Sequence, residues 1–407
     1  MKGNVIYGQS GGPSSVINSS ALGVIKESFA HESEIGDVYM MHHGILGCIN
    51  DDLIKADRDK MDEYNKLSHT PGAFFGNVRY KLQDYASDRK DYYRVLETLK
   101  KHDIHYFFYN GGNDSMDTCD KINRFLIKQD YSCKVIGIPK TIDNDLRCTD
   151  HTPGYGTSAK FIANAMEEID LDNASYPKGR VIICEIMGRH AGWLTASSAL
   201  AGINGYGPDL IYVPEVPFDM DDFIYKVKTI YEKKKRCLVA VSEGIVDSYG
   251  SFIFQVGKKV DSFGHIRLGG VGQVLANNIT DELGITALPI EFSFLQRACC
   301  SVSSAQDQKE AEEIGEEAVK QAIYGASGKM ICINRISSKP YRYEFKTAEL
   351  TSCANYEKKM PLDMIDTDKA YVTQKFIDYA LPLIQGEVES RFKDGVISVP
   401  MIKGYNC

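Results

Sequence analysis

A chain of 407 residues is longer than one hydrophobic core usually supports, so we expect two lobes. Its composition, 43% hydrophobic and 25% charged, is typical of a folded protein and argues against long disordered tracts. The net charge of −8 gives no electrostatic reason to expect binding to nucleic acid or to an anionic membrane.

The cysteine pattern indicates a reducing, cytoplasmic compartment. None of the 11 cysteines forms a Cys-x-x-Cys pair, and we expect free thiols. The first residues lack the apolar core of a signal peptide. No stretch approaches the roughly 18 uncharged apolar residues of a spanning helix, so no membrane association is expected.

Short apolar runs alternate with segments of helical length along most of the chain. Several runs are apolar on both faces, as strands buried in a parallel sheet are. The alternation predicts an α/β fold with doubly wound sheets. The candidate strands are residues 5–7, 38–41, 106–109, 135–138, 181–186, 210–213, 238–241 and 330–333. The candidate helices are residues 16–29, 116–127, 221–235 and 307–323.

The first candidate loop is Gly-Gln-Ser-Gly-Gly-Pro-Ser-Ser, residues 8–15, directly after the first strand. Ligands of open α/β sheets bind beyond the carboxyl ends of the strands. Glycines let backbone N–H groups approach an anion, and a following helix N-terminus favours negative charge. The loop lacks the Gly-Lys-Ser/Thr ending of a P-loop and is not a dinucleotide fingerprint. A tight turn in which Ser14 or Ser15 caps the helix is the alternative.

A second glycine loop follows the strand 106–109 and reads Asn-Gly-Gly-Asn-Asp-Ser, residues 110–115. Asn113 and Asp114 offer oxygen atoms to a magnesium ion or to phosphate-bound water. Capping of the helix 116–127 by Asp114 or Ser115 is the alternative reading.

The third loop, Pro-Lys-Thr-Ile-Asp-Asn-Asp at residues 139–145, joins two carboxylates to a lysine. One of Asp143 and Asp145 can accept a proton from an attacking hydroxyl while the other helps to hold a metal. Lys140 is a point charge suited to a phosphoryl group. A solvated turn would not need this lysine, and we favour a catalytic loop.

The fourth loop, Met-Gly-Arg-His at residues 187–190, ends a buried strand. Gly188 permits close approach, and Arg189 supplies a planar fork for phosphate or hydroxyl groups. An arginine at a strand end is usually only solvated, so this loop gains meaning from the other three.

These four loops, in this order, resemble the phosphofructokinase family, together with Ser-Glu-Gly at 242–244 and Leu-Gln-Arg at 295–297. Looser similarity extends from residue 4 to about 335. The resemblance implies two doubly wound, Rossmann-like lobes with the active site in the cleft between them. It implies a phosphoryl-donor lobe of residues 1–150 plus about 297–345, and a fructose 6-phosphate lobe of residues 151–296 plus about 346–407. It also implies Mg²⁺ as cofactor and a homodimer or homotetramer.

The resemblance also assigns roles to individual residues. Asp143 would be the general base at the sugar hydroxyl, Glu243 would hydrogen-bond the sugar, and Arg297 would grip its phosphate. Arg180 would reach the sugar phosphate, in relatives often across a subunit boundary. The remaining residues expected near the sugar phosphate are Thr141, Ile142, Met187, Gly188, Arg189 and Phe294. Those expected at the donor are Gly11, Gly12, Gly112, Asn113, Arg79 and Lys81, with Asn113 and Asp145 at the metal.

Two residues predict the phosphoryl donor. Asp114 and Lys140 stand where ATP-using relatives generally have glycine. A carboxylate at Asp114 would repel the α-phosphate of a nucleotide, and Lys140 would stabilise charge on the leaving phosphate. This pair resembles the pyrophosphate-dependent branch, whose reaction makes fructose 1,6-bisphosphate reversibly in glycolysis and gluconeogenesis.

Three departures from the family pattern keep alternatives open. Asn113 stands where many relatives have aspartate, and Phe294 replaces a histidine or tyrosine. Residues 285–294 contain no arginine where relatives carry one, Leu288 being nearest, and a cation from 258–267 such as Arg267 could replace it. The alternatives are an ATP-dependent 6-phosphofructokinase, a kinase for another sugar phosphate such as sedoheptulose 7-phosphate, and a non-catalytic sugar-phosphate-binding subunit. NAD kinases and lipid kinases do not share the third and fourth loops in this order.

Overall fold

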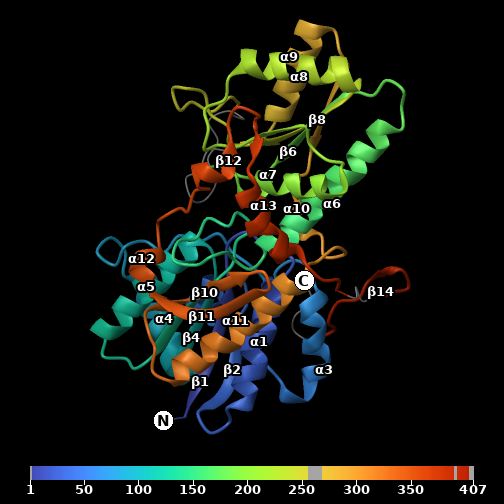
Figure 1. Ribbon diagram of the computed structural model, residues 1–407. Helices are drawn as coiled ribbons and strands as arrows, with labels where there is room; N and C mark the ends of the chain where they lie inside the picture. Colours follow the sequence, from blue (N-terminus) through green and yellow to red (C-terminus); the bar gives the residue numbers. More distant parts are fainter. Residues whose placement is uncertain (1, 255–267, 389–391, 403–407) are drawn as a thin grey trace.

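Two sheets, one mostly parallel with antiparallel edge strands and one wholly parallel, organise the chain into two lobes, as the computed structural model shows (Figure 1). It describes residues 2–254, 268–388 and 392–402, so Arg267 lies outside the described residues. The seven-stranded sheet has the order β11-β10-β5-β4-β1-β2-β3, and the four-stranded sheet has the order β7-β8-β6-β9. The predicted two-lobed α/β architecture is confirmed.

The strands of the first sheet are β1 (Gly3–Gln9), β2 (Ile35–Met41), β3 (Leu53–Lys55), β4 (Ile104–Gly111), β5 (Lys134–Pro139), β10 (Lys329–Ser338) and β11 (Tyr341–Glu349). Those of the second are β6 (Val181–Ile186), β7 (Leu210–Tyr212), β8 (Cys237–Ser242) and β9 (Ala287–Glu291). Two short hairpins add β12 (Ile365–Asp366), β13 (Tyr371–Val372), β14 (Phe392–Lys393) and β15 (Val396–Ile397).

The helices of the first lobe and its connections are α1 (Ile17–Ala30), α2 (Ile45–Asn50), α3 (Met61–Tyr64), α4 (Lys90–Lys101), α5 (Asn113–Lys128), α11 (Ala305–Ile323) and α12 (Leu350–Cys353). Those of the second are α6 (Tyr155–Ala174), α7 (Trp193–Ser197), α8 (Met220–Lys234), α9 (Val271–Leu283), α10 (Leu295–Ala298) and α13 (Gln374–Ala380). The side chains of Asp219 and Ser304 cap α8 and α11.

The first sheet is buried on both faces because its strands are apolar at successive positions. Val5 and Tyr7 pack with α1 and α11 on one face, whereas Ile6 packs with α2, α4 and α5 on the other. Helices α1 and α11 cross closely, since a Cβ atom at Gly23 would lie 2.0 Å from the carbonyl oxygen of Glu312. Figure 1 shows these two helices side by side in blue and orange.

The second sheet is wholly parallel and is covered in the same way. Ile182 and Cys184 face a core with α6, α7 and α13, and Val181 and Ile183 face a core with α8 and α9. The buried Trp193 belongs to the first of these cores, as expected for a packing residue. The loops that follow β6 and β8 therefore start from strands packed on both faces.

The predicted strands all exist, but some boundaries and elements differ. Helix α5 begins at Asn113, three residues before the predicted start, so Asn113 and Asp114 lie in its first turn. The predictions did not include β3, β9 or the antiparallel edge strand β11. The alternating exposure of β11 is the pattern of a half-exposed strand, a signal present in its sequence.

The two lobes share the C-terminal part of the chain. After β11, helix α12 packs with α5, and α13 joins the core of the second sheet. The proposed lobe boundaries at about residues 150, 297 and 345 stay a prediction. Among the described residues no helix is long and apolar enough to cross a membrane, and the ten cysteines there are free.

Candidate active site

A cavity of about 1120 Å³ lies between the two sheets, at the loops that follow β1, β4, β5, β6 and β8. Parallel sheets gather their strand carboxyl ends at one edge, which explains why loops distant in sequence meet here. The predicted site residues in its lining are Gly11, Gly12, Arg79, Lys81, Gly112, Asn113, Asp114, Lys140, Thr141, Ile142, Asp143, Asp145, Met187, Arg189, Glu243, Phe294 and Arg297.

Lys140 follows β5 and is buried, with an exposed fraction of 2%. Its ammonium donates to the carbonyl oxygens of Ser10 and Gly12 at 3.0 and 2.5 Å. Burial lowers the pKa of Lys140 to about 7, with Asp143 opposing the shift. Gly11 has φ 77°, and a Cβ atom there would lie 3.4 Å from the lysine nitrogen. The first and third loops therefore interlock around one cation.

Two arginines flank the glycine of the first loop. A Cβ atom at Gly12 would lie 2.9 Å from a guanidinium nitrogen of Arg297 and 3.7 Å from one of Arg79. The Ser15 hydroxyl donates to the carbonyl oxygens of Arg297 and Cys299, at 3.2 and 2.7 Å. Ser15 therefore does not cap α1, whose N-cap residue is Val16 without a side-chain hydrogen bond. Instead it ties the loop to the segment that carries Arg297.

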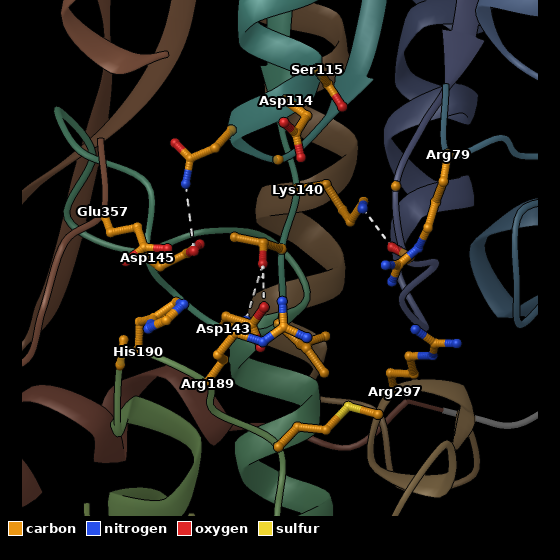
Figure 2. A pocket seen from close by; sticks show the side chains of 18 of the residues that line it. Arg79, Asp114, Ser115, Lys140, Asp143, Asp145, Arg189, His190, Arg297 and Glu357 are labelled. Atoms are coloured by element: carbon orange, nitrogen blue, oxygen red, sulfur yellow. Dashed lines mark hydrogen bonds between the residues drawn. The ribbon is translucent and has the colours of Figure 1, made fainter. Parts of the chain in front are cut away.

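The second loop presents the first turn of α5 to the cavity. Gly112 is the N-cap residue and no side chain caps the helix, so the capping roles considered for Asp114 and Ser115 are wrong. The N-terminus of a 16-residue helix carries partial positive charge and free N–H groups, which suit an anion. Asp114 places a negative charge beside that positive end (Figure 2).

Asp143 lies among cations in the middle of the cavity. Its backbone N–H donates to the Thr141 hydroxyl at 3.1 Å, which fixes the turn of the loop. Burial raises the pKa of Asp143, and the charges of Lys140 and Arg189 counteract the rise. In Figure 2, Arg79, Arg297 and Lys140 lie toward one side of Asp143.

On the other side of Asp143 lie Asp145, Glu357 and His190 (Figure 2). Burial raises the pKa of Asp145 to about 7, and the neighbouring carboxylates of Asp143 and Glu357 add to the rise. A cation placed near these carboxylates would relieve their mutual repulsion.

The fourth loop is held by its neighbours in the second lobe. The Ser242 hydroxyl donates to the carbonyl oxygen of Gly188 at 2.5 Å, and the N–H of Met187 donates to the Gln296 side chain at 3.1 Å. Glu243 lines the cavity, and burial followed by repulsion from Asp143 raises its pKa to about 7.

Arg189 is the cation of this loop. Its buried Nε has no hydrogen-bond partner among the described residues, and so retains a donor for a ligand.

Three residues that the sequence analysis discussed lie at the margin of the cavity or outside it. Arg180 is exposed at the opposite end of β6, with its guanidinium 5.9 Å from the Tyr176 ring centroid. Leu288 is 38% exposed on the edge strand β9. Phe294 is 63% exposed, and the Arg297 guanidinium lies 4.5 Å from its ring centroid. A role of Arg180 in a neighbouring subunit stays a prediction.

Sequence reasoning missed several lining residues. His190 was part of a quoted loop without a role, whereas Leu268, Asn355, Tyr356 and Glu357 were not considered. The last three come from an irregular segment after α12 that carries no glycine motif. Only the fold brings them to the cleft.

The fold and the cleft define a class: two doubly wound α/β lobes that enclose a cavity rich in cations, carboxylates and helix N-terminal amides. The family model described as phosphofructokinase matches residues 4–322. The chain belongs to the phosphofructokinase family.

Individual relatives match over almost the whole chain. A pyrophosphate–fructose 6-phosphate 1-phosphotransferase from Halomonas elongata is 42% identical and covers 97% of this chain and 95% of its own. One from Xanthomonas campestris is 41% identical over 95% and 92%. The crystal structure of a pyrophosphate-dependent phosphofructokinase from Marinobacter aquaeolei matches with a TM-score of 0.88 and 38% identity, covering 98% and 96%.

Proposed function

We propose that this enzyme transfers a phosphoryl group from pyrophosphate to the C1 hydroxyl of fructose 6-phosphate, reversibly, and forms fructose 1,6-bisphosphate. The observation that carries the proposal is the buried ammonium of Lys140, held between Ser10 and Gly12 and facing the same cavity as Asp114. Both relatives described above bear the name of this activity. The reaction belongs to glycolysis and gluconeogenesis.

The charges and the space around Lys140 indicate how the phosphoryl donor would be bound. Phosphoryl transfer requires in-line positioning and neutralisation of charge more than covalent chemistry. Lys140, Arg79 and Arg297 supply positive charge, Gly11, Gly12 and Gly112 supply close backbone approach, and Lys81 lies at the exposed rim. Asp114 would repel the additional phosphate of a nucleotide, which favours the smaller donor.

The third and fourth loops indicate how the sugar phosphate, the phosphoryl acceptor, would be bound. Asp143 would take the proton from the sugar C1 hydroxyl as the general base. The side chains proposed to hold the sugar and its phosphate surround it: Thr141, Ile142, Met187, Arg189, Glu243, Phe294 and Arg297, with Gly188 allowing close approach. Arg180 of a second copy would complete this side if the protein is a homodimer or homotetramer.

Members of the family generally use a divalent metal ion, and we propose Mg²⁺ between Asn113 and Asp145. In one orientation the Asn113 amide donates to Asp145 at 3.4 Å. Turned over, it donates to the carbonyl oxygens of Tyr356 and Cys353 at 2.9 and 3.2 Å, and its own oxygen faces the Asp145 carboxylate. The Asn113 oxygen and the Asp145 carboxylate would then hold the cation, which would neutralise charge on pyrophosphate.

The donor is tested by assaying the purified protein on fructose 6-phosphate with magnesium pyrophosphate and with MgATP. We expect turnover with pyrophosphate alone. Lys140→Met should lower kcat with pyrophosphate by about 10²–10³-fold, since it removes a cation aimed at developing negative charge. Lys134→Met, at the opposite end of β5, is the matched control and should leave kcat unchanged.

The double variant Asp114→Gly/Lys140→Gly separates the alternatives. It should lose activity with pyrophosphate and gain affinity for ATP. Wild-type turnover with ATP alone would contradict the donor assignment and leave the family intact. Wild-type inactivity with both donors would favour a different sugar phosphate or a non-catalytic subunit. A cytoplasmic location is part of the same proposal.

A further inference from the structure

Residues 353–360, here called the strap, run along the cleft from the first lobe to the second. Asn355, Tyr356 and Glu357 line the cavity that holds Asp143. The strap lies beyond residue 322, where the match to the family model ends. It is thus a part of the site that the family motifs do not describe.

The strap is fastened to the first lobe beside the donor loops. The Asn355 amide donates to the Asp117 carboxylate on α5 at 3.1 Å, and the Arg147 guanidinium lies 5.1 Å from the Tyr356 ring centroid. An isolated antiparallel bridge pairs Leu146 with Glu357. These contacts place the strap directly against the end of the third loop.

The strap is fastened to the second lobe by one carboxylate and one indole. The Glu215 carboxylate accepts from the N–H groups of Met360 and Gly192, each at 2.9 Å. The Trp193 indole N–H donates to the carbonyl oxygen of Lys358 at 2.9 Å. Gly192 and Trp193 follow the fourth loop directly, so the strap links the third loop to the fourth.

Lys358 makes the hydrogen bonds that join the strap to the third loop and to the residues after it. Its backbone N–H donates to the carbonyl oxygen of Asp145 at 2.6 Å. Its ammonium donates to the Asn144 side chain at 3.4 Å and to the carbonyl oxygens of Thr149 and Asp150 at 3.2 and 2.7 Å. An ammonium has three donors, and all three acceptors belong to residues 144–150.

The loop needs such support because its backbone is not in a relaxed conformation. Asn144, between the two aspartates, has φ 54°, in the left-handed region. Removal of the ammonium would leave the Thr149 carbonyl without its donor and the Asp150 carbonyl with the Tyr379 hydroxyl alone, which disfavours the present path of the chain. The same ammonium lies 5.3 Å from the Trp193 ring centroid, so the two loops are held at a fixed separation.

We propose that Lys358 is a positioning residue, which holds the Asp143–Asp145 turn against the fourth loop through three hydrogen bonds and the Trp193 contact. Lys358 is not among the residues that line the cavity. The proposal rests on the proposed function for its kinetic consequence, but the contact with Trp193 is measurable without turnover.

The test compares Lys358→Met with Lys359→Met, the exposed neighbour, in the full-length protein. Lys358→Met should lower kcat by about 100-fold, as expected when a catalytic group is misplaced by about 1 Å. KM for both substrates should stay unchanged, because the binding cations remain in place. Trp193 is the single tryptophan of the chain, so its emission maximum should change in Lys358→Met and not in Lys359→Met.

The outcomes of this comparison bear on the proposed role of Lys358 as follows. Equal kcat values for the two variants, or an unchanged emission maximum, would overturn the proposal. A rise in KM without a fall in kcat would also overturn it, because Lys358 would then act in binding. Failure of Lys358→Met to fold, with Lys358→Gln also unfolded, would reduce Lys358 to a general structural role. Wild-type inactivity would count against the proposed function only, and the emission comparison would still decide for Lys358.

Discussion

Lys140 illustrates how one buried side chain makes the site sensitive to pH. Desolvation disfavours the charged ammonium, as do the charges of Arg297 and Arg79, whereas Asp143 and Asp145 favour it. The pKa of Lys140 is therefore lowered to about 7, and the ammonium loses its charge within the physiological pH range. A negatively charged ligand beside it would restore the charged form.

We expect kcat/KM for pyrophosphate to fall as pH rises through about 7, because Lys140 then loses the charge that the donor needs. The corresponding limb in kcat should lie at higher pH, since bound pyrophosphate raises the pKa of the lysine. Initial-rate pH profiles measure both. Lys140→Arg keeps a permanent charge and should remove this limb. An unchanged limb in that variant would contradict the assignment.

At this scale the glycine loops predicted the residues that follow strands, the family resemblance added others such as Arg79 and Arg297, and the segment after α12 was missed. Lys140, Asp143 and Arg189 could be found because glycine loops after buried strands mark the ligand edge of a sheet. Asn355 and Glu357 reach the same cavity from an irregular segment. No local pattern distinguishes them from solvated polar residues, and only the return of the chain places them there.

At the scale of elements, the first lobe depends on the close crossing of α1 and α11. Gly23 faces the backbone of Glu312, and Gly315 faces that of Ser20, where a Cβ atom would lie 2.2 Å from the carbonyl oxygen. The absence of both side chains lets the two helices pack together over one face of the sheet. Neither helix could shift without opening that core.

Gly23→Ala should destabilise the protein by about 1–3 kcal/mol, because the added methyl group collides with rigid backbone. The urea unfolding midpoint measures the loss. Gly284→Ala is a suitable control, since a Cβ atom there meets nothing within 4 Å. Its cost, about 1 kcal/mol, comes from the left-handed backbone conformation alone. Equal midpoints for the two variants would show that α1 and α11 can separate at little cost.

The elements missed from the sequence are mostly at sheet edges. Strand β9 contains Pro289 and is only partly buried, and β11 exposes every second residue. Edge strands carry weaker hydrophobic patterns because one side of their backbone or one face meets solvent. The buried central strand β6 was predicted with its observed bounds, and β1, β4, β5 and β8 were predicted within two residues at each end, because both faces of such strands must be apolar.

At the scale of the whole molecule, a buried polar network joins the third loop to distant elements. His151, with an exposed fraction of 1%, contacts the carboxylates of Asp150 at 2.8 Å and Glu310 of α11 at 2.7 Å. Arg335 of β10 bonds Asp150, and Tyr341 of β11 donates to Glu310. The network thus couples the stability of the first lobe to the segment that follows the third loop.

This network predicts a pH-dependent stability. Burial opposes the charged form of His151, but Glu310 and Asp150 outweigh it and raise the pKa to about 9. Because the folded pKa exceeds the unfolded one, the stabilisation is complete below about pH 6.5 and is lost as pH rises through about 9. Its size is about 3 kcal/mol.

The free energy of unfolding, measured with urea between about pH 6 and 9, should fall in the wild type relative to His151→Gln, because the other groups that titrate in this window, such as Lys140, contribute equally to both proteins. The wild type and His42→Gln, a variant of a partly exposed histidine, should keep a constant difference across the same window. A wild-type slope retained in His151→Gln would assign the pH dependence to other groups.

The strand order of the first sheet has a consequence for biosynthesis. Strands β10 and β11 and helix α11 come from residues 305–349, yet they complete a sheet and a face begun by β1. Strands β6 to β9 of the second sheet lie within one continuous stretch, residues 181–291. On the ribosome the N-terminal half therefore waits with an uncovered apolar face while the strands of the second sheet can already pair, and chaperones would be needed most during that interval.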